Sequence, residues 1–195
     1  YDLARMIQST RAVARGPVAR VVANGGRNSH DWTPEKDALL KVFDDAGITS
    51  AFMDPSEGGY IEGPKNLALA LMAFELSWVD AGSATASLAG NLGLSPIHER
   101  GTPEQRAYYM SRAVPAQPGE NRKPWRYAFA LTEPGVGSHP ATMTTRAEPS
   151  ADGKYFIING EKLWCTNGVK AGVIVVMAKT PPRIVKGKEK NQVTA

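Results

Sequence analysis

The sequence lacks several features that define large protein classes. It has one cysteine, Cys165, among 195 residues, which excludes an internal disulfide framework and is typical of a reducing compartment. No apolar run approaches the roughly 20 residues that a membrane-spanning helix needs. The net charge of +4 is mild and by itself identifies neither nucleic acid nor an anionic cofactor as a partner. An apolar fraction of 42% is that of a globular protein with a substantial core, built as one domain or two small ones.

Two familiar nucleotide-binding motifs are also absent. The run from Phe129 to Ser138, FALTEPGVGS, reads as an apolar strand that ends in a loop with Gly135 and Gly137. A dinucleotide fingerprint needs a third glycine where Pro140 stands and a helix after it, but the following residues favour a strand. No P-loop spacing is present either. The loop is therefore either a glycine-rich turn between strands or a concave nest of backbone N–H groups for an anion, with the Ser138 hydroxyl as a further donor.

Residues 1–124 have the pattern of a helical bundle. Apolar residues recur at helical spacing, and capping signals mark where helices begin. The predicted helices run from Asp2 to Ala23 with a break at Gly16-Pro17, from Pro34 after the N-cap Thr33 to Gly47, from Pro64 to about Asp80, from Gly82 to Leu94, and from the capping box at Thr102 to about Arg112. The helix from Pro64 is apolar around most of its circumference, so we expect it to be buried on several sides. The small residues from Gly82 to Leu94 allow close approach of either a neighbouring helix or a ligand chain.

Residues 125–195 have the pattern of short strands. The predicted strands are Trp125 to Thr132, Met143 to Ala147, a hairpin of Tyr155 to Ile158 with Glu161 to Trp164 around an Asn159-Gly160 turn, Val173 to Ala178, and a last one from Gln192. The fold class is thus α+β, with an all-α helical bundle followed by an antiparallel β-barrel or sandwich. The last strand looks cut off at its beginning, so we expect a fragment that exposes a strand edge.

Three stretches together resemble the acyl-CoA dehydrogenases. The first is ALTEPGVGS at 130–138, the second is NGEKLWCTN at 159–167, and the third runs from Glu75-Leu76 to the helix start GTPEQ at 101–105. The resemblance covers nearly the whole chain in the right order. It implies an N-terminal helical domain (1–124), part of a middle β-domain (125–195), and a C-terminal four-helix domain that is missing from this chain.

The resemblance also implies an FAD site. Its residues are Phe129, Leu131, Thr132, Gly137, Ser138, Trp164, Cys165 and Thr166. The backbone of Leu131 and the Thr132 hydroxyl are expected at the edge of the flavin ring, Trp164 beside the isoalloxazine, and the Thr166 hydroxyl as a donor to flavin N5. Donors at these positions stabilise the charge that develops when the ring accepts a hydride. Cys165 adjoins the motif and is expected to pack rather than react.

For the substrate, an acyl-CoA thioester, the resemblance implies a tunnel lined by Thr85, Leu88 and Leu92, with Ser138 on the thioester side. In this family a carboxylate removes the α-proton while the β-hydride leaves to flavin N5. That carboxylate belongs to the C-terminal domain, so no catalytic residue is assigned here, and Glu133 is expected to belong to the structure of the loop. Implied partners are an electron-transfer flavoprotein as electron acceptor and further copies in a homodimer or homotetramer. The expected location is the cytoplasm if bacterial and the mitochondrial matrix if eukaryotic.

Some features depart from the family pattern. His139 stands where the pattern usually has aspartate, and Pro140 follows it. The basic segment 181–190 is expected to be a solvated loop that could contact a CoA phosphate or adenine nucleotide.

His30 and His98 have no partner at metal-ligand spacing, so no metal site is predicted. The alternatives to a dehydrogenase are an oxidase or flavin hydroxylase on the same scaffold, a flavin-free structural relative, or a basic nucleic-acid-binding module. The last is disfavoured because its charges lie in different domains without an aromatic platform.

Overall fold

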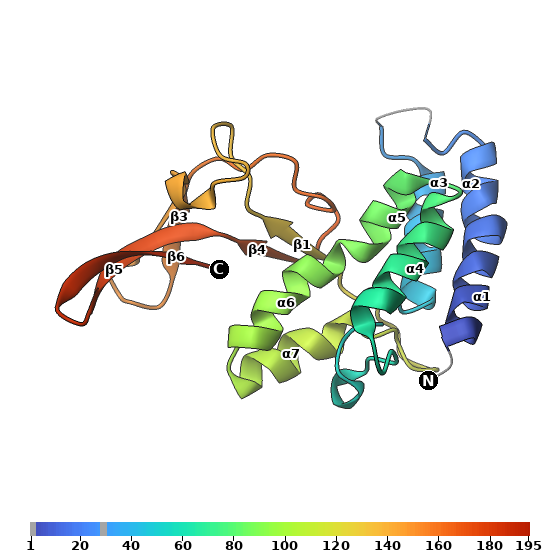
Figure 1. Cartoon of the computed structure of the whole chain (residues 1–195), viewed down its shortest axis with the longest axis horizontal. Coiled ribbons are helices and arrows are strands. Elements are labelled where there is room, and N and C mark those ends of the chain that lie inside the picture. The colour runs from blue at the N-terminus through green and yellow to red at the C-terminus, as the bar shows by residue number, and fades with distance from the viewer. Residues whose placement is uncertain (1–2, 28–30) are drawn as a thin grey trace.

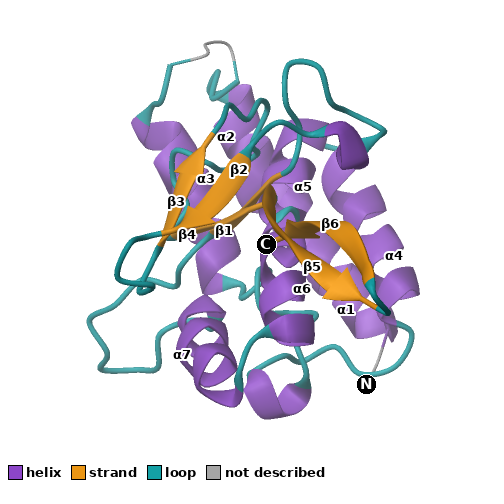
Figure 2. Ribbon diagram, turned by 90° about the vertical axis from the view of Figure 1, so that its left-hand side faces the viewer, coloured by secondary structure: helices purple, strands orange, loops and turns teal. Residues whose placement is uncertain are grey.

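The computed structural model describes residues 3–27 and 31–195, so His30 lies outside the described residues. Helices occupy one side and strands the other, and the strands lie in front of the helices when viewed from their own side (Figures 1 and 2). The helices are α1 (Leu3–Val13), α2 (Ala19–Ala23), α3 (Pro34–Asp45), α4 (Lys65–Ser77), α5 (Ala81–Leu88), α6 (Gly90–Arg100) and α7 (Pro103–Ala113). The strands are β1 (Tyr127–Ala130), β2 (Arg146–Pro149), β3 (Phe156–Asn159), β4 (Val173–Val176), β5 (Ala178–Val185) and β6 (Lys188–Thr194). In the described residues, no helix combines the length and apolar character needed to cross a bilayer.

The helix starts follow the local sequence signals. Thr33 caps α3 by accepting from the Lys36 N–H, and Thr102 exchanges hydrogen bonds with Gln105 in a capping box at α7. Asp80 caps α5 in the same way, because its carboxylate accepts from the Ser83 N–H at 2.7 Å. Each cap satisfies a backbone donor that the first helical turn leaves unpaired. The predicted break at Gly16-Pro17 is confirmed as a π-helical turn, Ala14–Val18, between α1 and α2.

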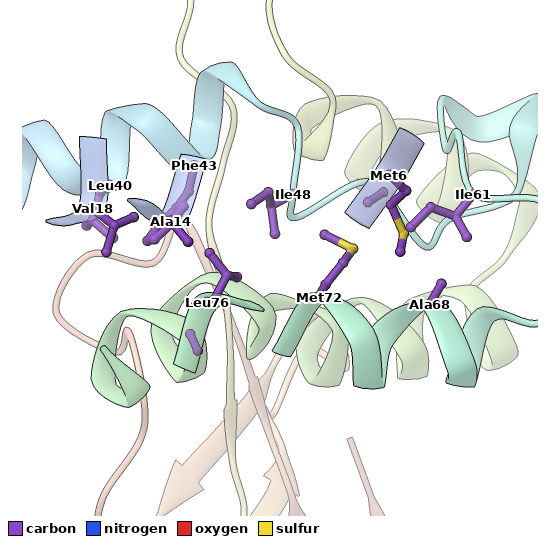
Figure 3. Close-up of a cluster of buried hydrophobic side chains, with 12 residues drawn as sticks. Met6, Ala14, Val18, Leu40, Phe43, Ile48, Ile61, Ala68, Met72 and Leu76 are labelled. Atoms are coloured by element: carbon purple, nitrogen blue, oxygen red, sulfur yellow. The ribbon is translucent and has the colours of Figure 1, made fainter. Parts of the chain in front are cut away.

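The main core lies between α1, α3 and α4. Ala68, Met72 and Leu76 project from α4 toward side chains such as Phe43 and Ile48 on the opposite side (Figure 3). The prediction that this helix is buried on several sides is wrong for one face, where three large side chains are exposed. They are Leu67 (49%), Phe74 (63%) and Trp78 (70%).

A second core cluster joins the helices to the strands. Met53, Leu94, Met110 and Ala113 pack around Tyr127 of β1, which is fully buried. The Tyr127 hydroxyl donates to the Tyr109 carbonyl, and burial raises its pKa above the ordinary value. The β-domain is therefore anchored by its first strand.

Small residues let α6 approach its neighbours closely. A Cβ added at Gly93 would lie 2.9 Å from both the Ala128 carbonyl oxygen and the Tyr127 Cβ. A Cβ added at Gly90 would lie 2.9 Å from the Thr49 side chain. At these two positions, close packing explains the small residues. The helix predicted from Gly82 to Leu94 is in fact two helices, α5 and α6, joined at Ala89.

The strands form two open sheets rather than an antiparallel barrel, which corrects that part of the predicted fold class. β1 pairs with β4 in parallel, from Tyr127 with Val173 to Ala130 with Val176. The second sheet has the order β3-β2-β5-β6, with antiparallel pairs at both ends and a parallel contact between β2 and β5. Parallel pairing requires a long connection between the strands, and the segment from residue 131 to 172 provides it between β1 and β4.

Two local predictions in the β-domain are also wrong. Asn159-Gly160 is not a hairpin turn: β3 pairs with β2, and residues 161–164 form no strand. Gly160 instead approaches Thr145 so closely that an added Cβ would lie 2.4 Å from its hydroxyl. The basic segment 181–190 is not a loop but most of the β5–β6 hairpin, which extends away from the helices in Figure 1. Its turn, Lys186-Gly187, has positive φ at both residues (53° and 73°), as a two-residue hairpin turn of the favoured kind requires.

Candidate functional site

The two motifs at 130–138 and 159–167 meet in space. The Leu163 N–H donates to the Thr132 carbonyl at 2.8 Å. The Lys162 ammonium donates to the Leu131 carbonyl at 2.9 Å. These bonds bring the end of β1 beside the segment that leads into Trp164, so residues some 30 positions apart form one site.

Glu133 holds this junction together from inside. Its side chain is buried, and its carboxylate accepts from the N–H (2.6 Å) and hydroxyl (2.8 Å) of Thr144, from the Thr145 N–H (2.9 Å) and from the Lys162 ammonium (3.0 Å). Burial by itself would raise the pKa of Glu133, but the hydrogen bonds from Thr144, Thr145 and Lys162 lower it well below the ordinary value. The carboxylate is thus ionised and fully engaged, in agreement with the structural role expected for it.

The glycine loop after Glu133 leaves its backbone open to a ligand. Glu133 and Val136 exchange backbone hydrogen bonds of 3.0 Å around Pro134 and Gly135, so the loop is a tight turn. Neither Gly135 nor Gly137 has a positive φ, and a Cβ added at either would meet open space. The loop is thus the glycine-rich turn that the sequence offered as one of its two interpretations. Since neither backbone strain nor crowding requires glycine here, the open space fits close approach by a bound molecule.

Trp164 projects into solvent beside this loop. Its side chain is 85% exposed, and its φ of 54° is unusual for a residue other than glycine. The following turn is fixed from the helical side, because the Asn167 amide donates to the Ala86 carbonyl of α5 at 2.8 Å. A bulky ring held outward by strained, anchored backbone is available to cover a ligand.

The Cys165 thiol lies beside the Phe129 backbone. Burial raises the pKa of the Cys165 thiol, which outweighs a hydrogen bond from the Phe129 backbone N–H. A raised pKa keeps the thiol protonated at neutral pH. This geometry fits a packing role for the cysteine. The Ser138 and Thr166 side chains are exposed, while Leu131 and Thr132 are half-buried.

The three residues expected to line a substrate tunnel are divided between two helices. Thr85 on α5 is exposed and donates its hydroxyl to the Ala81 carbonyl at 2.9 Å, and Leu92 on α6 is 60% exposed. Leu88 is half-buried and packs against the main helical core. The two exposed side chains are open to a ligand, whereas Leu88 already has protein partners.

Two histidines differ from each other in their surroundings. His139 is exposed at the start of a short 3-10 turn, Pro140–Thr142, and its carbonyl accepts from the Thr142 hydroxyl at 2.9 Å. His98, by contrast, lies beside Asp54 and Glu57. Spacing along the sequence did not reveal these partners, because they lie more than 40 positions away and belong to a different element.

Two domain models of one family match most of the chain. The family described as "Acyl-CoA dehydrogenase, N-terminal domain" matches residues 2–116, and "Acyl-CoA dehydrogenase, middle domain" matches residues 128–194. The mouse protein "Very long-chain specific acyl-CoA dehydrogenase, mitochondrial" is 35% identical over 188 residues, which are 92% of this chain and 27% of the mouse protein. The chain therefore spans about a quarter of the length of that relative.

Two solved structures share the fold. One, described as an electron transferring flavoprotein of Acidaminococcus fermentans, has 28% identity and a TM-score of 0.76 over 92% of this chain and 43% of that one. The other is an acyl-CoA dehydrogenase complexed with FAD from Bacillus anthracis, with 25% identity and a TM-score of 0.73 over 98% of this chain and 30% of that one.

Proposed function

The chain belongs to the acyl-CoA dehydrogenase family, and we propose that it supplies the flavin-binding part of an FAD-dependent acyl-CoA dehydrogenase. In this proposal residues 1–124 are the helical domain and residues 125–195 belong to the middle β-domain. The observation that carries the proposal is the junction of the two motifs. The hydrogen bond from the Leu163 N–H to the Thr132 carbonyl and the buried Glu133–Lys162 pair hold Thr132 and Trp164 at one site.

The residues at this site fit a flavin dinucleotide. The open space at Gly135 and Gly137 leaves room for a bulky phosphate group close to the backbone. The exposed Trp164 offers a flat apolar face of the kind that packs on an aromatic ring system. The exposed Ser138 and Thr166 supply hydroxyl donors from the two motifs.

Each residue then has a distinct part in binding. Leu131 and Thr132 meet the edge of the flavin ring, Gly137 and Ser138 lie by the pyrophosphate, Trp164 shields the ring from water, and Thr166 donates a hydrogen bond to the ring. Phe129 and Cys165 pack behind these residues. When bound, FAD supplies the acceptor for the hydride that leaves the β-carbon of the thioester. The donors of the chain lower the energy of that transfer because they are already oriented.

The substrate in this proposal is an acyl-CoA thioester. Ser138 lies on its thioester side, and the exposed Thr85 and Leu92 line its acyl chain, with Leu88 as the half-buried floor. The mouse relative is named for very long chains, and a panel of acyl-CoA lengths tests whether this preference is shared. The family resemblance implies that the proton-abstracting carboxylate belongs to the C-terminal domain, outside residues 1–195. Glu133, the carboxylate of the motif, is buried and fully hydrogen-bonded, so we do not assign it this role. An electron-transfer flavoprotein as electron acceptor, a homodimer or homotetramer, and a mitochondrial matrix location in a eukaryote, or a cytoplasmic one in a bacterium, complete the proposal.

Titration of the chain with FAD tests the site directly. Binding is followed by quenching of flavin fluorescence. We expect Trp164→Leu to weaken FAD binding by up to about tenfold, because a stacked aromatic side chain contributes about 0.5–1.5 kcal/mol beyond its area burial. Trp78→Leu is the matched control: it removes another exposed tryptophan, directly after α4, and should leave FAD affinity unchanged.

Equal effects of the two substitutions, or no FAD binding by the folded chain, would contradict the proposed site. The reaction is tested on the protein at its natural length, by anaerobic loss of flavin absorbance when an acyl-CoA is added. Peroxide formation with rapid oxygen uptake would instead assign the oxidase alternative.

A further inference from the structure

His98 of α6 lies in a side-chain cluster that the proposed flavin site does not use. Its Nε2 is 3.0 Å from Asp54 Oδ2 and 3.7 Å from Glu57 Oε2. One atom of each side chain lies within 4.8 Å of those of the other two. A tetrahedral zinc ion with bonds of about 2.0–2.2 Å separates its ligand atoms by about 3.3–3.6 Å. The two measured distances lie on either side of this spacing, so small movements bring the three atoms onto one cation.

Neighbouring cations orient the two carboxylates. Lys65 Nζ lies 3.0 Å from Asp54 Oδ1, and Arg106 donates to Glu57 Oε1 from Nη2 (2.7 Å) and Nε (3.1 Å). In both carboxylates the cation occupies the oxygen that does not face His98. The oxygens that face the imidazole are therefore held in place for another partner.

One of these oxygens accepts no hydrogen bond in the described part of the chain, although the His98 imidazole lies 3.7 Å away. Glu57 Oε2 is buried and accepts no hydrogen bond there. Leaving a buried carboxylate oxygen without a donor is costly, and such groups in native proteins point to a bound water or ion. This unsatisfied oxygen is an observation separate from the spacing of the ligand atoms.

The other nitrogen of the imidazole also has a carboxylate partner. His98 Nδ1 lies 3.3 Å from Glu99 Oε1, which is the carboxylate–histidine arrangement that orients metal-binding imidazoles. A cavity of about 390 Å³, lined by residues that include Asp54, Asn91 and His98, lies beside the cluster and provides access from solvent.

We propose that Asp54 Oδ2, Glu57 Oε2 and His98 Nε2 form a binding site for a divalent transition-metal ion, with zinc the best fit to one imidazole and two carboxylates. The ion links the 3-10 turn Pro55–Glu57 to α6, and water completes its coordination. The metal site shares no residue with the proposed flavin site. Its test is therefore independent of the proposed function.

The test is calorimetric titration of chelator-treated chain with zinc chloride, at a pH where His98 is neutral. We expect one zinc ion per chain and a rise in the thermal midpoint of unfolding when zinc is added. Asp54→Asn, Glu57→Gln and His98→Gln should each weaken zinc binding at least about tenfold. His139→Gln removes an exposed histidine elsewhere and should leave zinc binding unchanged.

Exchanging one metal ligand for another distinguishes loss of the metal site from loss of the fold. His98→Cys keeps a metal-binding atom on the side chain of residue 98, although the sulfur lies closer to the backbone than Nε2. Its cobalt form should therefore show a thiolate-to-cobalt charge-transfer band that the wild-type cobalt form lacks. Failure of the wild-type chain to bind zinc would overturn the site. So would zinc binding that persists in His98→Gln, or a folded His98→Cys variant without the band.

Discussion

Replacing Lys162 with methionine tests whether the buried Glu133–Lys162 pair holds the two motifs of the proposed flavin site together. The Lys162 side chain is 11% exposed and that of Glu133 is 2% exposed, and their charged atoms are 3.0 Å apart. Methionine keeps much of the side-chain volume and removes the charge. The Glu133 carboxylate then stays buried with its hydrogen bonds from Thr144 and Thr145 but without a cation.

The size of the effect follows from the burial of the pair. Breaking a buried ion pair from one side costs about 3–5 kcal/mol, because the remaining charge is uncompensated. We expect Lys162→Met to lower the unfolding free energy by about 3 kcal/mol, the lower end of this range, since Glu133 keeps its hydrogen bonds from Thr144 and Thr145. The double variant Glu133→Gln/Lys162→Met should lose less stability than the sum of the two single variants, because neither charge is then stranded.

Urea denaturation followed by circular dichroism measures these differences in unfolding free energy. Lys41→Met is the control, because its ion pair with Asp45 has a similar N–O distance, 2.7 Å, but both side chains are more than 60% exposed. Such a surface pair contributes about 0.3–0.5 kcal/mol. Equal losses in Lys162→Met and Lys41→Met would refute the structural role that we assign to the buried pair.

The same pair has a pH signature. The folded-state pKa of Glu133 lies below its ordinary value of 4.5, so its contribution to stability is complete above that pH. As the pH falls below about 4.5, the unfolded chain takes up the proton first and the contribution is lost. The stability difference between wild type and Glu133→Gln should therefore shrink on acidification from pH 6. A difference that grows would contradict the assignment.

Three further outcomes follow from the structure. Gly137→Ala should change the unfolding free energy by less than about 0.5 kcal/mol, because the added Cβ meets open space, yet weaken FAD binding in the fluorescence titration. Gly93→Ala should destabilise the chain by about 1–3 kcal/mol in urea, since its Cβ would lie 2.9 Å from the Ala128 carbonyl oxygen; a neutral result would contradict the packing of α6 on β1. The hydrogen bond to Asp54 raises the pKa of His98, so its stabilising effect is complete below the ordinary value of 6.5 and is lost as pH rises through the folded-state pKa. In chelator-containing buffer, the stability difference between wild type and His98→Gln should thus be smaller at pH 8.5 than at pH 5.5. At pH 5.5 the imidazolium also faces Glu57 and Glu99, which favour its charge, and Arg106, which opposes it.

Much of the helical half could be predicted from residues close together in the chain. Thr33 and Thr102 are caps in the structure because their side chains bond to backbone groups three positions away. The π-helical turn at Gly16-Pro17 follows from the missing N–H of proline. The family resemblance also rested on short motifs, and the matches to both domains confirm it.

The pairing of strands could not be predicted in this way. Alternation and turn residues marked most of the β-segments. The Asn159-Gly160 pair predicted a hairpin turn, but in the structure β3 pairs with β2 instead of with residues 161–164. The basic residues of 181–190 suggested a solvated loop, yet the segment pairs with its neighbour around Lys186-Gly187. Which strands meet depends on contacts between distant segments, and local propensity is a weak guide to them.

The sequence by itself determined the family, the helix boundaries set by caps, and the two motifs of the proposed flavin site. Only the tertiary structure decided that Glu133 and Lys162 fasten those motifs together from inside, and that His98 meets Asp54 and Glu57. The physical reason is the range of the interactions. Caps and turns are satisfied within a few residues, whereas a buried charge must find its partner wherever the folded chain brings one.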